Sequence, residues 1–99
     1  MRSRDVRRVL EDGRPLHGNR VVVFLAPGAG VAGFIAGRKV GNAVERNRAR
    51  RILRAAWLEI ARGIGSGYDT VLVARAAIRG AKTQDLVAEM TELFREGTR

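Results

Sequence analysis

The chain has 99 residues, a length typical of one domain with a single hydrophobic core. It contains no cysteine, which excludes disulfides and thiolate metal sites. The 19 Lys and Arg outnumber the 10 Asp and Glu, and the net charge of +9 is typical of a nucleic-acid-binding protein. Because no apolar run is long enough to span a membrane and no signal-peptide pattern is present, we expect one cytoplasmic domain over residues 1–99.

The first part of the chain predicts a short helix followed by strands. Residues 3–11 carry apolar side chains on one side, with Ser3 as the expected cap, and Asp12-Gly13 ends this helix. Strand-forming residues bounded by turn residues then occupy 14–17, 20–26 and 31–36. Because residues 27–30 read Pro-Gly-Ala-Gly, we expect the last two of these strands to form a hairpin.

The predicted helix over residues 42–62 is the most unusual segment. Asn42 is its expected cap, with Glu45 in the capping-box position. At about 100° per residue, five side chains share one arc and form a stripe of guanidinium groups and one amide: Arg46, Asn47, Arg50, Arg51 and Arg54. Arginines four residues apart repel one another, so this pattern favours a bound polyanion, and arginine suits forked contacts with phosphate.

The rest of the chain completes the order α-β-β-β-α-β-α. A short basic loop at 37–41 precedes the long helix, and three glycines end it: Gly63, Gly65 and Gly67. A strand at 70–75 and a loop at 76–82 follow. Thr83 is the expected cap of a last helix that ends near Glu96.

The charge is concentrated in the middle of the chain. Residues 13–58 hold nine Lys or Arg against Glu45 alone, whereas residues 1–12 contribute +1 and residues 59–99 contribute 0. His17 has no second His or Cys with which to form a nucleophile–base pair or a zinc site. No two acids are spaced to form a two-metal site beside the basic stripe. We therefore expect a protein that binds and positions RNA, in preference to a membrane-surface protein.

The basic helix and its surroundings resemble the bacterial ribonuclease P protein family. The family signature, Arg-Asn-Arg-x-Lys/Arg-Arg-x-x-Arg, is matched by residues 46–54, and the strand and basic turn before it by residues 33–41. Gly67-Tyr68-Asp69 also fits, and the resemblance extends nearly end to end. It implies an α+β two-layer sandwich with a four-stranded sheet, a ribosomal-protein-like fold. The third and fourth strands are then joined by the basic helix in a left-handed βαβ crossover, against the usual preference.

The resemblance also implies a function. In this family the catalyst is a large RNA, and the protein subunit is not catalytic by itself. The holoenzyme is an endoribonuclease that hydrolyses one phosphodiester of precursor tRNA and releases the 5′ leader. It requires Mg²⁺, which is bound mainly by the RNA. The implied partners are the ribonuclease P catalytic RNA and the precursor tRNA leader, with no cofactor on the protein, no membrane and no obligatory protein partner.

Residue roles follow from the same resemblance. Eight positions match the basic face towards the catalytic RNA: Arg38, Lys39, Arg46, Asn47, Arg48, Arg50, Arg51 and Arg54. Three positions match an apolar cleft for the leader: Val6, Leu10 and Phe24. The family commonly has aromatic residues at all three, whereas only Phe24 is aromatic here. Because bases stack on aromatic rings, this difference predicts weaker or less selective contact with the leader.

Two other functions would also suit a small basic domain. The first is a stand-alone RNA-binding or ribosome-associated protein on a similar fold, which would leave precursor tRNA processing unchanged. The second is a self-sufficient nuclease, which would cleave without an RNA partner. The lack of a recognisable catalytic constellation disfavours the nuclease, and the match over residues 33–57 favours the ribonuclease P subunit.

Overall fold

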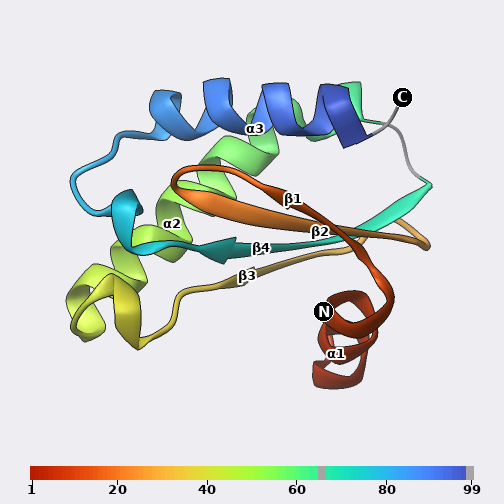
Figure 1. Ribbon diagram of the computed structural model, residues 1–99, viewed down its shortest axis with the longest axis horizontal. Helices are drawn as coiled ribbons and strands as arrows, with labels where there is room; N and C mark the ends of the chain where they lie inside the picture. The colour runs from red at the N-terminus through yellow and green to blue at the C-terminus, as the bar shows by residue number, and fades with distance from the viewer. Residues whose placement is uncertain (65–66, 98–99) are drawn as a thin grey trace.

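The computed structural model describes residues 1–64 and 67–97, which form a mixed four-stranded sheet between a short helix and two longer ones (Figure 1). The helices are α1 (Ser3–Asp12), α2 (Ala43–Ile60) and α3 (Thr83–Gly97). The strands are β1 (Arg14–His17), β2 (Val21–Pro27), β3 (Ala32–Ile35) and β4 (Tyr68–Ala74). Short 3₁₀ turns are η1 (Arg38–Val40), η2 (Ala61–Gly63) and η3 (Ala76–Ile78). The predicted order α-β-β-β-α-β-α is confirmed.

The expected hairpin between β2 and β3 is wrong. The strands lie in the order β1-β2-β4-β3, so β4 separates the two, antiparallel to β2 and parallel to β3. The lengths and compositions of the strands explain this order. β2 and β4 have seven residues each and pair along their whole length, whereas β3 has four residues and a central Gly33, which suits a sheet edge.

The connection from β3 through α2 to β4 is a parallel crossover. In Figure 1 both strands run from right to left, and α2 passes behind them as the chain moves from β3 to β4. The crossover is therefore left-handed, as the resemblance implied and against the usual preference. Through this crossover the chain passes from β3, at the edge of the sheet, to β4, an inner strand, and the basic helix α2 forms the connection.

The main core lies between the sheet and the pair α2 and α3. Alternate residues of β2, Val21, Val23 and Leu25, belong to this core together with Leu53 of α2 and Met90 of α3. A smaller cluster lies on the other face, where Val9 of α1 packs with Ala26 and Val71. The two-layer sandwich is thus confirmed for the sheet, α2 and α3, and α1 covers part of the second face.

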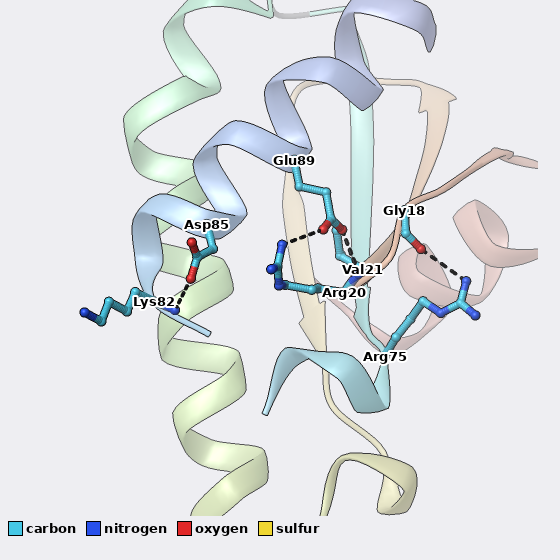
Figure 2. Close-up of polar contacts among 7 residues, drawn as sticks. All are labelled: Gly18, Arg20, Val21, Arg75, Lys82, Asp85 and Glu89. Atoms are coloured by element: carbon cyan, nitrogen blue, oxygen red, sulfur yellow. Dashed lines mark hydrogen bonds and ion pairs between the residues drawn. The ribbon is translucent and has the colours of Figure 1, made fainter. Parts of the chain in front are cut away.

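The helix ends test the predicted caps. The capping box at α2 is confirmed, because the Glu45 N–H donates to Asn42 Oδ1 at 2.9 Å and the Asn42 N–H donates to Glu45 Oε1 at 3.1 Å. Ser3 is not a cap: Arg2 holds that position without a side-chain hydrogen bond, and Ser3 begins α1. Thr83 likewise begins α3, and the Lys82 N–H before it donates to Asp85 at 2.8 Å (Figure 2).

The α2 helix ends at Ile60 and continues into η2, whose last residue is Gly63. Gly65, one of the three glycines expected to end this helix, lies outside the described residues. The other predicted boundaries agree with the structure to within about two residues, as is usual for element ends. None of the helices in the described part of the chain combines the length and hydropathy of a membrane-spanning segment.

Candidate nucleic-acid interface

Four of the predicted polar side chains meet along one open groove of about 660 Å³ beside α2. We call it the basic groove, and its lining residues are Phe34, Val44, Asn47, Arg50, Arg51 and Arg54. Within it, Arg50 Nη2 donates to Asn47 Oδ1. The half-buried Phe34 of β3 adds an aromatic surface to these guanidinium groups. Such a lining suits both phosphates and unstacked bases.

Exposed apolar residues flank the arginines on α2. Val44 is 73% exposed and Leu58 is 66% exposed. Val44 precedes Asn47 by one helical turn and Leu58 follows Arg54 by one turn, so both lie on the same side of the helix as the groove. A helix that served only solubility would carry polar side chains at these positions. The exposed side of α2 therefore combines charge with apolar contact area.

The remaining predicted basic residues are not in the groove. Arg48 lies on another side of α2, where its Nη2 donates to the Ala81 carbonyl oxygen at 2.9 Å. Arg46 is half-buried, and Arg38 and Lys39 are exposed on η1 just before the helix. The predicted basic face is thus divided between the groove and four residues that do not line it, Arg38, Lys39, Arg46 and Arg48.

Sequence reasoning did not identify Arg79. This residue follows η3 and forms an ion pair with Glu45, with Nε 2.8 Å from Oε2. Together with Arg48, the two residues line a smaller pocket of about 290 Å³. No local sequence signal links Arg79 to the basic helix, because their proximity depends on how the chain after β4 packs against α2.

The three residues expected to contact the leader also lie together. Val6 and Leu10 of α1 and Phe24 of β2 are half-buried and pack against the small cluster on the α1 side of the sheet. We call this region the apolar face and include in it two more half-buried residues that pack there, Ile35 and Val73. It lies on the opposite side of the sheet from the main core.

A further open pocket of about 520 Å³ joins the two surfaces around the β3 edge. It shares Phe34 and Arg54 with the basic groove and Val6 with the apolar face. Trp57 also lines it, with its ring 5.6 Å from that of Phe94 at an angle of 49°. The basic groove and the apolar face are therefore parts of one continuous surface.

Asp69 lies on the α1 side of the sheet and is only 4% exposed. It accepts hydrogen bonds from the backbone N–H groups of Gly30 and Val31 and pairs with Arg8 of α1. Burial alone raises the pKa of Asp69, but the hydrogen bonds from Val31, Gly30 and Arg8 outweigh it and lower the pKa below the ordinary value. Asp69 is thus held as a carboxylate beside the apolar face.

None of the described residues that line the basic groove is a carboxylate or a histidine. Within residues 1–64 and 67–97, the His, Asp and Glu side chains do not gather in threes as a metal site would require. His17 is exposed on β1, at one edge of the sheet. Most carboxylates of α3 form local or structural contacts: Asp85 bonds to the Lys82 N–H, Glu89 to the start of β2, and Glu92 to Arg95.

Comparison with known proteins identifies the family of the chain. A sequence model of the family described as Ribonuclease P matches residues 1–97. The chain is 36% identical to the ribonuclease P protein component of Chloroflexus aggregans over 99 residues, which is 96% of this chain and 73% of that protein. It is 40% identical to the component of Syntrophomonas wolfei over 79 residues, which is 77% of this chain and 66% of that protein.

Solved structures show the same fold. The RNase P protein from Thermotoga maritima superposes with a TM-score of 0.80 at 22% identity, covering 97% of this chain and 94% of that one. The Staphylococcus aureus RNase P protein superposes with a TM-score of 0.79 at 19% identity, covering 98% of this chain and 92% of that one.

Proposed function

The chain belongs to the ribonuclease P protein family, and from that premise we propose that it binds the catalytic RNA through the basic groove and the precursor tRNA leader through the apolar face. As a member of this family it is the protein subunit of ribonuclease P, the holoenzyme that cleaves tRNA precursors. Partnership with RNA follows from that membership. What we propose beyond it is that the catalytic RNA binds the basic groove and that the leader binds the apolar face.

The composition of the basic groove is the observation that most directly supports binding of the catalytic RNA. Arg50, Arg51 and Arg54 lie along one open channel beside an aromatic ring. Arginines in such a channel neutralise phosphates and fix the register of a folded RNA without reading its sequence. Arg38 and Lys39, exposed just before α2, would extend these contacts, and Arg46 and Arg48 would act at the start of the helix.

The apolar face supports the leader contact. Val6, Leu10 and Phe24 come from two different elements and lie together beside half-buried Ile35 and Val73. Unpaired nucleotides offer their bases to such surfaces, and each base that stacks on an aromatic ring gains about 1–3 kcal/mol. With Phe24 as the one aromatic ring among the three positions, we expect the leader to gain less here than from three rings.

In this proposal the RNA breaks the phosphodiester bond and holds most of the required Mg²⁺. The described residues present no cluster of acids that fits a Mg²⁺ site. The protein's contribution is electrostatic. Its cations offset the repulsion between the phosphates of the catalytic RNA and those of the precursor, so less Mg²⁺ is needed. A cytoplasmic location is part of the same proposal.

Reconstitution tests the proposal. The protein is mixed with bacterial ribonuclease P RNA and precursor tRNA at a Mg²⁺ concentration at which the RNA alone is slow. We expect cleavage with both components and none with the protein alone. A variant that changes Arg50, Arg51 and Arg54 to Ala should lose this rescue, whereas Arg95→Ala, an exposed arginine of α3, should retain it.

Each other outcome identifies one of the alternatives. Cleavage by the protein alone would support a self-sufficient nuclease. Failure to stimulate the RNA, together with binding to ribosomal RNA, would support a stand-alone RNA-binding protein.

A further inference from the structure

One buried carboxylate connects three segments of the chain. Asp69 is the second residue of β4 and lies opposite Ala26 of β2. Its Oδ1 accepts the N–H groups of Gly30 and Val31, each at 3.0 Å, and its Oδ2 accepts Arg8 Nη2 from α1. The carboxylate thus holds β4, the loop before β3, and α1 in one arrangement.

The loop before β3 is shaped around this carboxylate. A Cβ atom at Gly28 would collide with the Asp69 side chain, so a larger residue cannot occupy that position without displacing Asp69. The Gly28 N–H donates to the Gly67 carbonyl at 3.0 Å, and the Thr70 N–H donates to the Val31 carbonyl at 2.9 Å. The loop is therefore tied to β4 on both sides of Asp69.

Arg8 links α1 to the same point. Its Nη1 also donates to the Pro27 carbonyl at 3.3 Å, so the guanidinium bridges the carboxylate and the end of β2. Val9 is the one side chain of α1 that is fully buried, and Val6 and Leu10 are half-buried beside it. Val6 and Leu10, which belong to the apolar face, lie two residues before and two residues after Arg8.

We propose that Asp69 is a positioning residue for leader binding: through Arg8 it sets where α1 places Val6 and Leu10 relative to Phe24. The inference rests on the proposed leader contact and adds to it a residue that does not touch the leader. Asp69 and Arg8 are 61 positions apart in the sequence, so the assembly of the apolar face depends on tertiary contact. A displaced α1 leaves the basic groove intact, because α2 packs on the other side of the sheet.

Glu89 supplies a matched control within the same molecule (Figure 2). This carboxylate of α3 also accepts two backbone N–H groups, of Arg20 at 2.8 Å and of Val21 at 3.2 Å, and pairs with one guanidinium, that of Arg20. It joins α3 to the start of β2, on the face of the sheet that α1 does not cover. Asp69 and Glu89 therefore make the same kinds of bond, but only Asp69 reaches α1.

The test compares Asp69→Asn with Glu89→Gln in the reconstituted holoenzyme. Asparagine keeps an oxygen for the loop N–H groups but removes the charge that pairs with Arg8. We expect Asp69→Asn to weaken binding of precursor tRNA relative to mature tRNA by about fivefold or more, the loss that a misplaced base contact produces. Affinity for the catalytic RNA and the cleavage rate at saturating substrate should stay unchanged. Glu89→Gln should leave the precursor-to-mature ratio unchanged.

Arg8→Met is the second variant, and it is needed in case Asp69→Asn folds poorly. This change removes a guanidinium that is 39% exposed, and the Asp69 carboxylate keeps its two hydrogen bonds from the Gly30 and Val31 N–H groups. It should reduce the precursor-to-mature ratio to the same extent as Asp69→Asn, and the double variant should lose no more. Circular dichroism and thermal melting check that each variant is folded.

Three results separate the possible failures. Equal losses for precursor and mature tRNA, or equal effects of Asp69→Asn and Glu89→Gln, would overturn the positioning role. An unchanged ratio in Arg8→Met, while Phe24→Ala lowers it, would overturn that role and retain the leader contact. A wild-type protein that binds the two tRNAs equally would overturn the leader contact itself.

Discussion

Arg79 forms an ion pair with Glu45, with its Nε 2.8 Å from Oε2 of the carboxylate. Glu45 is the one acid in residues 13–58, and it also accepts the Asn42 N–H in the capping box of α2. The acid in the first turn of the basic helix is thus paired with an arginine that follows β4 and η3 in the chain. In the proposed function, this pairing keeps an unpaired carboxylate away from the RNA contacts of α2.

This pair leads to a first prediction. Replacing Arg79 with Ala should weaken RNA binding, because Glu45 would then repel nearby phosphates. Glu45→Gln in the same chain should restore much of the loss, since glutamine can still form the capping box. The free energy of unfolding should change by less than about 1 kcal/mol, because Arg79 is 59% exposed and exposed pairs contribute little. A double-mutant cycle of RNA affinities tests this, and strictly additive losses would contradict it.

The groove arginines lead to a second prediction. Arg50→Ala and Arg54→Ala should each weaken affinity for the catalytic RNA and lower the slope of log affinity against log salt by roughly one unit. Arg95→Ala should leave the slope unchanged, because Arg95 lies on α3 and pairs with Glu92 at 2.8 Å. Titrations at several salt concentrations measure the slopes. If one of the two substitutions leaves the slope unchanged, the proposed phosphate contact of that arginine is refuted.

Phe24 allows the leader contact to be separated from packing. Phe24→Leu should keep most of the apolar contact with the cluster around Val9 but remove the aromatic ring. We expect it to weaken binding of precursor tRNA more than that of mature tRNA, by up to about 1–3 kcal/mol for one stacked base. Val22→Ala, on the same side of β2, is the control for lost packing and should affect both tRNAs equally. Equal losses for both tRNAs in Phe24→Leu would disprove stacking at this site.

The lowered pKa of Asp69 predicts a pH dependence of stability. Because the folded-state pKa lies below the unfolded value of about 3.9, ionised Asp69 stabilises the fold above that pH, and this contribution is lost as the pH falls through the folded value. The difference in unfolding free energy between wild type and Asp69→Asn should therefore be constant from about pH 7 to pH 5 and shrink below about pH 4. Urea unfolding at each pH measures it, and a difference that grows on acidification would contradict the assignment.

Local patterns predicted the elements well, and their failures have physical causes. The capping box at Asn42 and Glu45 was predictable because its two residues are three positions apart in the sequence. The hairpin between β2 and β3 was predicted wrongly, because Pro27 and the glycines after it show that the chain turns but not which strand lies next to β2. Ser3 and Thr83 were assigned as caps one residue too late, since each begins its helix.

The candidate site was also predictable in part, where its residues lie on one helix. The helical spacing brought Asn47, Arg50, Arg51 and Arg54 together as expected, and the structure adds Phe34 from a different element. Arg48, which the resemblance placed on the same basic face, bonds to the Ala81 carbonyl oxygen outside the groove. The RNA-binding and leader-binding roles of the individual residues stay predictions, to be settled by the binding experiments above.

The sequence by itself determined which segments are helices and that α2 carries a stripe of arginines, because these features depend on residues a few positions apart. The tertiary structure alone decided that β4 lies between β2 and β3, that the crossover is left-handed, and that Asp69 meets Arg8. Periodicity specifies a face but not its partner. The partner is chosen only when distant segments compete to bury the same apolar surface and to pair the same buried charge.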